Sequence, residues 1–474
     1  MKKYILNQLG EIVNNNIVSF HVPGHKLGKI YDRLGYSNIL ENIYKMDTTE
    51  ILGTDNLHSP DGIIKKSQER AARVFKSKNT YYLINGSTCG IQGAIMSVCN
   101  PKDKIIVNRD CHQSVINTFI LGDIEPVYIY PQIDTKTNIL MGIKIEDAVN
   151  TINDNLDAKA ILLTYPTYYG KVYDLKTICD YAHSKGMIVI GDEAHGAHLG
   201  LSNRLPMTAL EQGADIVIQS THKTLPSFTQ SSMLHIQGER INQDRLTSIL
   251  RMIESSSPSY MLMSSLELAV DIYEKKGEFL MEELLHNIDI FKNNINKNEH
   301  IKIYNDDDIT KIFISSKELG ITGYELDEML RINYNIQVEL SNYYGVLLIC
   351  TIGNDRADFE ALEYALEDIS LNYKNDKSID NIEYPMNIPV KELSPREAFY
   401  NEKKSVKIYD SIDKICGEYI IPYPPGICLV SPGEIITKEV IDYILVCNKK
   451  GMNISGIKDS KLEYIQIIEN DHKE

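Results

Sequence analysis

The sequence has no tryptophan, no CxxC pair and no apolar run long enough to cross a membrane. Its eight cysteines are scattered, most of them inside apolar strings such as LLIC and IMSVC. This pattern predicts buried free thiols and argues against a disulfide framework or a zinc site. The opening residues, MKKYILNQLG, also lack the apolar stretch of a secretory signal. We therefore expect a cytoplasmic protein with no membrane segment and no bound metal.

Positive charge is scarce as well. Lysine and arginine number 49 against 65 aspartates and glutamates, which gives a formal net charge of -16. A surface of this sign disfavours a nucleic-acid backbone or an anionic membrane as the main partner. At 474 residues the chain is too long for one simple core, so two or three domains are expected.

What the sequence does contain, over a long middle region, is an alternation of short apolar strands and amphipathic helices. Helical patterns such as IEDAVNTIND and DLKTICDYAHSKG separate the strands. This alternation, with strands rich in Val and Ile, predicts an α/β fold whose mostly parallel sheet is covered on both faces. The expected strands are KIIVN (104–108), PVYIY (126–130), AILLTYP (160–166), MIVIGDEAH (187–195) and DIVIQSTHK (215–223).

The pattern changes after Pro258. Apolar residues recur at helical spacing through most of SYMLMSSLELAVDIYEKKGEFLMEELLHNIDIFKNNI, which predicts one or two long helices. A smaller α/β unit follows, and then the polar stretch LNYKNDKSIDNIEYPMN, which we interpret as a linker. The expected division is an N-terminal segment (1–45), a large domain (46–257), a long helix with a small α/β domain (258–375) and a C-terminal domain (376–474).

The stretch NGSTCGIQGAIMSVC (85–99) places small hydroxyl residues, Ser87 and Thr88, directly before a helical pattern. Free backbone N–H groups and the positive end of the dipole make such a helix start suitable for a phosphate. An ordinary helix cap with a glycine turn would have the same sequence. Because the Walker lysine is absent, an NTPase is not supported.

Asp192 and Lys223 stand at the polar ends of two predicted strands. A carboxylate at the end of the buried strand MIVIGD is costly unless a cation pairs with it. An arginine or a metal held with His195 and His198 would also serve, although the spacing of these histidines is not a recognised helical zinc pair. Lys223, in QSTHKTLPSFTQSS, has the ordinary alternative of a solvated surface lysine.

These groups gain meaning in combination, because the carboxyl ends of parallel strands form the ligand site of such sheets. A phosphate-binding loop, a buried carboxylate and a lysine at one sheet edge suit pyridoxal phosphate. His112, which follows the strand KIIVN, could stack on the cofactor ring, although a lone histidine is more often structural.

Longer motifs carry a specific resemblance. They are FHVPGHKLG (20–28), MDTTEILGTDNLHSPDGII (46–64), YPTYYGKVYDL (165–175), GDEAHGAHLG (191–200), STHKTLPSFTQSS (220–232), SSPSYMLMSSLE (256–267), LSPREAFY (393–400) and IIPYPPGICLVSPGE (420–434). In this order, over nearly the whole chain, they resemble the ornithine/lysine/arginine decarboxylases, in a short form without the N-terminal wing domain. The resemblance implies a large domain of the aspartate-aminotransferase-like fold (fold type I), a smaller α/β domain and a C-terminal α+β domain.

The resemblance also implies roles for individual residues. Lys223 would form the Schiff base with pyridoxal 5'-phosphate, and Asp192 would pair with its pyridine nitrogen. His222 would lie beside the substrate carboxylate, and it or Lys223 would return a proton to the α-carbon. The further implied cofactor contacts are the stacking His112, the phosphate-binding Ser87, Thr88 and Ser220, the neighbouring Cys89, and Ala194 and His195 on the other side of the ring.

The implied reaction is decarboxylation of a basic amino acid for polyamine biosynthesis. We expect arginine to give agmatine, with lysine to cadaverine next and ornithine to putrescine third. The basic side chain needs a carboxylate, and the candidates are Asp47, Glu50, Asp55 and Glu418, each of which could instead be structural. A homodimer with the site at the subunit interface is expected.

Two other readings remain open. The chain could be another fold type I enzyme, an aminotransferase or a lyase, although no arginine stands in a motif that demands a second substrate carboxylate. It could also be a non-catalytic relative that binds amines, although such a protein would be expected to lose Lys223 or Asp192.

Overall fold

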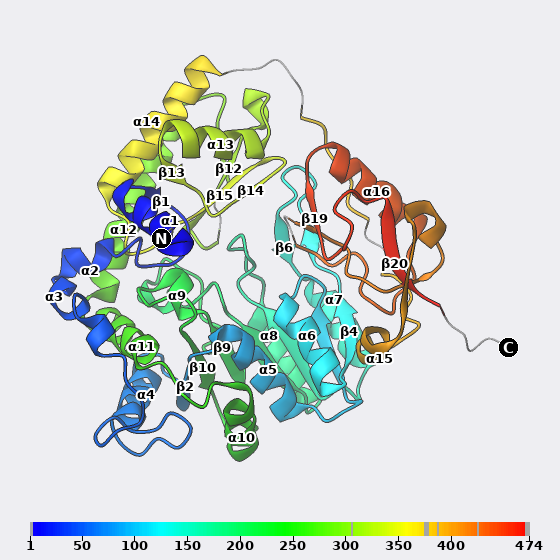
Figure 1. Ribbon diagram of the computed structural model, residues 1–474, viewed down its shortest axis with the longest axis horizontal. Coiled ribbons are helices and arrows are strands. Elements are labelled where there is room, and N and C mark those ends of the chain that lie inside the picture. Colours follow the sequence, from blue (N-terminus) through cyan, green and yellow to red (C-terminus); the bar gives the residue numbers. More distant parts are fainter. Residues whose placement is uncertain (1–2, 305–306, 374–378, 386–387, 424–425, 470–474) are drawn as a thin grey trace.

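A seven-stranded sheet forms the centre of the protein. The computed structural model describes residues 3–304, 307–373, 379–385, 388–423 and 426–469. The strand order is β2-β10-β9-β8-β7-β3-β4, and only β10 runs antiparallel to its neighbours. The strands are β2 (Asn79–Leu83), β3 (Lys104–Asn108), β4 (Glu125–Ile129), β7 (Ala160–Thr164), β8 (Ile188–Asp192), β9 (Ile216–Gln219) and β10 (Ser232–Ile236). The expected mostly parallel sheet is confirmed (Figure 1).

Both faces of this sheet are covered, because successive side chains of its strands point to opposite sides. Ile106, Ile161 and Val189 belong to the core that contains α7 (Ile145–Asp154) and α8 (Leu175–Ser184). Their sequence neighbours, such as Ile105 and Leu162, belong to a second core. Helices α5 (Gly86–Val98), α6 (Gln113–Gly122) and α10 (Gln243–Ile253) supply that core. Continuous apolar strands are therefore buried on both sides.

Two smaller sheets flank the central one, one at the upper left of Figure 1 and one at its right. The antiparallel sheet β11-β12-β15-β14 consists of β11 (Lys302–Tyr304), β12 (Lys311–Ser315), β14 (Leu340–Asn342) and β15 (Gly345–Ile349). The sheet β16-β20-β17 consists of β16 (Lys403–Lys407), β17 (Ile415–Cys416) and β20 (Tyr464–Ile468). The remaining strands form pairs: β1 (Val18–Ser19) with β13 (Ile336–Gln337), β5 (Gln132–Ile133) with β6 (Leu140–Gly142), and β18 (Ile421–Tyr423) with β19 (Asn453–Ser455). The β1–β13 pair ties the N-terminal segment to the neighbourhood of the four-stranded sheet.

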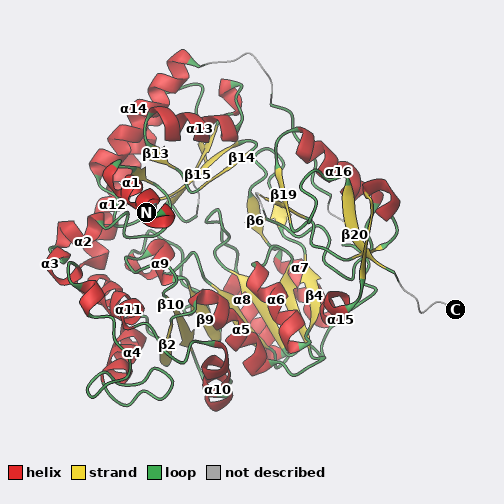
Figure 2. Cartoon of the chain, in the orientation of Figure 1, coloured by secondary structure: helices red, strands yellow, loops and turns green. Residues whose placement is uncertain are grey.

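The other helices, drawn in red in Figure 2, pack around these sheets. They are α1 (Tyr4–Asn14), α2 (Lys29–Leu34), α3 (Ser37–Leu40), α4 (Ile63–Val74), α9 (Thr221–Thr224), α11 (Tyr260–Ile272), α12 (Glu278–Ile295), α13 (Gly323–Asn333), α14 (Arg356–Asn372), α15 (Pro395–Tyr400) and α16 (Lys438–Lys449). The long helical pattern after Pro258 is two helices, α11 and α12, joined by a π-helical segment at Tyr273–Gly277. Within the described part of the chain, no helix combines the length and apolarity that a membrane crossing requires.

Three details differ from the sequence interpretation or lie outside it. Lys223 does not end a strand: β9 stops at Gln219, and the lysine lies on the four-residue helix α9, which starts after Ser220. The domain limits that we drew stay a prediction. The expected linker, 371–387, begins inside α14 and lies partly outside the described residues.

A buried ion pair joins the C-terminal part of the chain to the central sheet, close to the carboxyl end of β3. Arg109, directly after β3, donates from Nη1 and Nη2 to both carboxylate oxygens of Glu434 (2.7 and 2.6 Å) and from Nε to the carbonyl of Cys428 (2.7 Å). Both side chains of the pair are almost fully buried. Because an unpaired buried charge is costly, this pair holds the 428–434 segment against the strand end that precedes His112.

Candidate active site

A cavity of about 480 Å³ opens at the carboxyl ends of the central strands. Of the residues predicted from the sequence, Ser87, His112, Asp192, Ala194, His195 and Lys223 line it. Ile421, Gly426, Cys428 and Ser455 reach it from the C-terminal part. The parallel pairing of β8 with β9 is what brings Asp192 and Lys223 to one edge, as expected from their positions after neighbouring strands.

Lys223 faces this cavity in an environment that disfavours its charged form. Burial lowers the pKa of its ammonium group, the charges of Asp192 and Glu339 oppose the change, and the charge of Lys311 adds to it. Its Nζ lies 2.8 Å from Nε2 of His195. A larger fraction of neutral amine at neutral pH is what a lysine needs in order to attack a carbonyl.

Asp192 is a buried carboxylate that lacks a strong internal partner. Its Oδ1 accepts the N–H of Ala194 (3.2 Å), and no lysine or arginine among the described residues forms an ion pair with it. Burial raises its pKa, while the charges of His112 and Lys223 oppose that rise. Such a group is stabilised by a cationic ligand placed in the cavity, so the site fits the protonated pyridine nitrogen of pyridoxal phosphate.

The histidines around the cavity are held by different partners. His112 caps the start of α6: its Nδ1 accepts the N–H of Ser114 (3.2 Å), and burial lowers its pKa. Burial also holds the pKa of His195 well below its usual value, with the nearby Lys223 adding to the effect. His198 turns away and pairs with Asp308 (3.2 Å), so His195 and His198 do not share a ligand position.

Two of the residues predicted to bind phosphate, Ser87 and Ser220, come together where the starts of two helices meet. Ser220, before α9, donates its hydroxyl to the hydroxyl of Ser87 in the first turn of α5 (2.7 Å). The side chain of Asn85 does not cap α5, and the first turn of that helix contains no acidic residue. Free amide groups, a helix dipole and two hydroxyls suit an anion.

Three other residues predicted to contact the cofactor do not line the cavity: Thr88, Cys89 and His222. Thr88 is exposed at the start of α5. Cys89 turns its thiol toward the Gly86 carbonyl (3.0 Å) and Glu254 Oε1 (3.5 Å), away from the cavity lining. His222 donates from Nδ1 to the carbonyl of Ser231 (2.8 Å), so its ring is anchored beside the site rather than in the lining. Their roles stay predictions.

None of the four candidate substrate carboxylates lines the cavity as the described residues define it. Asp47 and Glu50 are exposed. Asp55 organises its own loop: burial opposes the change, but backbone N–H groups, including those of Asp61 and Gly62, lower its pKa to about 2. Both oxygens of Glu418 accept backbone amides, those of Lys458 and Gln466 (3.0 Å each).

The cavity also contains groups that the sequence interpretation did not single out. Asp110 lines it, and burial raises the pKa of this carboxyl. Tyr168 lines it as well, with its ring centroid 4.4 Å from that of His195. Glu339 accepts the Tyr168 hydroxyl from behind (2.6 Å). The motif YPTYYG contains Tyr168, but nothing in the local sequence indicates that Glu339 would meet it.

A mostly parallel central sheet with a buried aspartate at the end of one strand and a lysine just beyond the end of the next matches the fold type I class of pyridoxal-phosphate enzymes. Comparison of the sequence with protein families gives a narrower assignment. The major domain of the Orn/Lys/Arg decarboxylases matches residues 5–315, and their C-terminal domain matches residues 383–463. The chain belongs to the Orn/Lys/Arg decarboxylase family, as the resemblance of its motifs predicted.

Curated relatives agree over nearly the full length. An arginine decarboxylase of Bacillus anthracis is 37% identical across 98% of this chain and 97% of its own. An arginine decarboxylase of Bacillus subtilis is 37% identical across 95% and 94% of the two chains. The constitutive lysine decarboxylase of Escherichia coli is 22% identical and is matched over 76% of its length. The expectation of a decarboxylase is thereby confirmed.

Solved structures confirm the fold. The lysine decarboxylase of Francisella novicida superposes with a TM-score of 0.80 over 94% of this chain and 78% of its own, at 23% identity. The ureidoglycine-glyoxylate aminotransferase of Bacillus subtilis gives a TM-score of 0.54 over 69% of this chain and 91% of its own, at 13% identity. The α/β architecture is therefore common to decarboxylases and aminotransferases, and fold alone does not separate them.

Proposed function

We propose that the protein is a pyridoxal-phosphate-dependent decarboxylase that converts arginine to agmatine, with lysine and ornithine as weaker substrates. The observation that carries this proposal is that the half-buried Lys223 and the buried Asp192 line the same cavity. The names of the relatives at 37% identity favour arginine over lysine, whereas the named lysine decarboxylases are more distant. The product would enter polyamine biosynthesis.

The chain's residues would divide the work as follows. Lys223 would hold the cofactor covalently, Asp192 would keep a proton on its ring nitrogen, and His112 would pack against the ring. Ser87 and Ser220, with the amide groups that start α5, would bind the phosphate. When bound, the cofactor supplies an electron-withdrawing ring that accepts the electron pair left by departing carbon dioxide.

Lys223 is the favoured group for returning a proton to the α-carbon. Its Nζ faces the cavity and is hydrogen-bonded to His195, whereas His222 donates its Nδ1 proton to the Ser231 carbonyl. Protonation at that carbon gives an amine product instead of a ketone. The lowered pKa of Lys223 brings its proton affinity nearer to neutral pH, where a general acid works best.

An aminotransferase is the main alternative. Such an enzyme usually binds a second substrate carboxylate through an arginine. Among the described residues that line the cavity there is no arginine, and the neighbouring Arg109 is bound to Glu434. A non-catalytic amine-binding role is disfavoured because both Lys223 and Asp192 are present and line the cavity.

We further propose a homodimer, with each active site completed by the neighbouring subunit. Asp47 and Glu50 are exposed in the single chain, and so are the apolar side chains of their sequence neighbours Tyr44, Met46 and Leu52. Glu50 would then contribute a carboxylate, across the interface, to the pocket that binds the basic side chain of the substrate. Sedimentation equilibrium of the cofactor-loaded protein is expected to give twice the mass of the chain, and a monomer at micromolar concentration would contradict this.

We place the reaction in the cytoplasm, in keeping with eight buried free thiols.

The substrate assignment is tested by measuring carbon dioxide release from arginine, lysine and ornithine side by side, with pyridoxal phosphate supplied. Arginine is expected to give the highest kcat/KM, with agmatine as the product, because two relatives that are 37% identical over nearly the full length are named arginine decarboxylases. Carbon dioxide release from lysine alone would show that lysine, and not arginine, is the substrate. Protein that binds the cofactor but releases nothing from any of the three would exclude the proposed reaction.

A further inference from the structure

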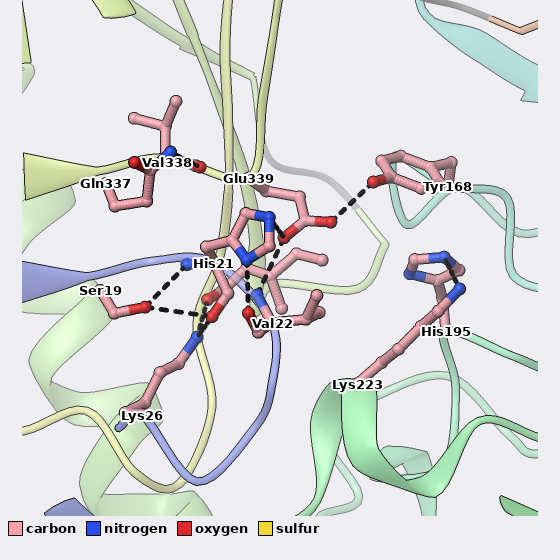
Figure 3. Close-up of polar contacts among 11 residues, drawn as sticks. Ser19, His21, Val22, Lys26, Tyr168, His195, Lys223, Gln337, Val338 and Glu339 are labelled. Atoms are coloured by element: carbon pink, nitrogen blue, oxygen red, sulfur yellow. Dashed lines mark hydrogen bonds and ion pairs between the residues drawn. The ribbon is translucent and has the colours of Figure 1, made fainter. Parts of the chain in front are cut away.

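Glu339 is a buried carboxylate that lies outside the cavity lining but close to the lysine. It follows β13, and its side chain is only 5% exposed. One oxygen accepts the hydroxyl of Tyr168 (2.6 Å), and the other accepts the N–H of Val22 (3.0 Å) (Figure 3). Glu339 therefore joins a loop of the central sheet to the N-terminal segment.

From Tyr168, a line of side chains leads to the lysine. The Tyr168 and His195 ring centroids are 4.4 Å apart, with the rings tilted by 57°. Nε2 of His195 then lies 2.8 Å from Nζ of Lys223, as Figure 3 shows. A ring that packs against an imidazole limits the orientations that the imidazole can adopt. Tyr168 therefore limits the direction in which His195 points, and the hydrogen bond to Glu339 helps to fix the position of Tyr168.

A backbone route leads from Glu339 to the same short helix. Val22 continues through Pro23 to Gly24, whose N–H donates to the carbonyl of His222 (2.7 Å), the residue before Lys223. A Cβ at Gly24 would lie 2.5 Å from the Leu225 carbonyl oxygen, so only glycine permits this approach. Lys26 closes the segment by donating to the carbonyls of His21 (2.8 Å) and Ile349 (2.9 Å). The contacts give the motif FHVPGHK, which the proposed chemistry does not use, a structural purpose.

The charge of Glu339 also acts on the lysine. Burial lowers the pKa of Lys223, and the negative charge of Glu339 opposes part of that decrease. Glu339 opposes the lowering of the Lys26 pKa by burial in the same way. Among the described residues no lysine or arginine forms an ion pair with Glu339, and its nearest cationic candidate is the His21 Nε2 atom at 3.9 Å. The other charged groups that act on Lys223 are Asp192 at the end of β8, which raises its pKa, and Lys311 on β12, which lowers it. Three histidines also face the lysine, and burial and then its charge lower the pKa of each: His195 after β8, His112 before α6 and His222 on α9.

We propose that Glu339 is a positioning residue for Lys223: it anchors Tyr168, which orients the His195 imidazole that faces the lysine amine. This inference rests on the proposed role of Lys223 as the cofactor-binding lysine. Glu339, which follows β13, thereby links the position of that segment to the geometry and the protonation of Lys223.

The test is a pH titration of the visible absorbance of the lysine-bound cofactor in the holoenzyme, combined with steady-state kinetics. Glu339→Gln keeps the shape and removes the charge. The titration midpoint is therefore expected to fall by about one pH unit, because a negative charge nearby stabilises the protonated nitrogen. Glu339→Asp keeps the charge but is too short to reach Tyr168, and Tyr168→Phe removes the hydroxyl while retaining the ring. Each of these two is expected to lower kcat about tenfold with little change in KM.

Tyr169→Phe and Glu283→Gln serve as matched controls, since Tyr169 adjoins Tyr168 in the chain and Glu283 pairs with Arg33 at the surface. Both are expected to behave as the unmodified enzyme. The double variant Tyr168→Phe/Glu339→Asp is expected to lose no more than either single variant, because both break one contact.

Three results would overturn the inference: an unchanged midpoint in Glu339→Gln, losses that multiply in the double variant, or a raised KM for arginine with kcat unchanged. The last would make Glu339 a substrate-binding group. The absorbance titration needs no substrate, so it reports on Glu339 even if the proposed decarboxylation fails.

Discussion

Replacing Lys223 with alanine is expected to abolish decarboxylation and to remove the visible absorbance of the lysine-bound cofactor. The loss in kcat should be at least about 10⁴-fold, because the residue acts as a covalent group and as a proton donor. The structural basis is the half-buried lysine that faces the cavity: burial lowers the pKa of its amine, and Nε2 of His195 lies 2.8 Å from it. The measurement is a comparison of absorbance spectra and initial rates after loading with pyridoxal phosphate.

Lys223→Arg is the matched control, since it retains a positive charge near Asp192 but offers no neutral amine at neutral pH. It is expected to fold and to be as inactive as the alanine variant. Methylamine, added as an external amine, should restore a small part of the rate to Lys223→Ala and none to Lys223→Arg. Activity in either variant within tenfold of the unmodified enzyme would remove Lys223 from the mechanism.

Asp192→Asn is expected to lower kcat by roughly 10³-fold while the cofactor remains bound. An asparagine keeps the shape of the side chain but has no negative charge to hold a proton on the ring nitrogen. The ring then accepts electrons poorly, so the bond to carbon dioxide breaks more slowly. Rates at saturating substrate, measured beside the absorbance of the bound cofactor, separate this loss from a loss of binding.

Asp110 provides a sharp comparison for that experiment. It is a second carboxylate in the lining of the same cavity, and burial raises its pKa as it does that of Asp192. The side-chain amide of Asn108 donates to Asp110 (2.6 Å), whereas Asp192 accepts a longer contact from the backbone amide of Ala194 (3.2 Å). Asp110→Asn is therefore expected to retain most of the activity. If Asp110→Asn were the inactive variant and Asp192→Asn the active one, the pyridine-nitrogen partner would be Asp110.

Local sequence was sufficient for the features whose causes are local. Runs such as AILLTYP and MIVIGDEAH became strands because they are β-branched and apolar, and they lie side by side because helices that connect parallel strands return the chain to the same edge. Asp192 and Lys223 follow adjacent strands of that sheet. Their convergence could therefore be predicted from order and polarity alone.

Side-chain direction was harder to predict than position. Ser87 and Cys89 both stand in the first turns of α5, yet Ser87 faces the cavity and Cys89 faces Glu254. The phase of a helix decides this, and the phase depends on what the rest of the helix buries. Similarly, Asp55 and Glu418 have the charge expected of substrate ligands, but backbone amides from their own surroundings occupy their oxygens.

The sequence by itself determined the family, the central sheet and the pair Asp192 and Lys223, because these depend on motifs and periodicities that are complete within short segments. Only the tertiary structure decided that Glu339 would meet Tyr168 and Val22, and that Gly24 would meet the helix of Lys223. Tyr168 and Glu339 are 171 residues apart, and their contact depends on how the four-stranded sheet and the N-terminal segment pack on the central one. Contacts between distant segments arise from the summed burial of many apolar side chains, and no local pattern records that sum.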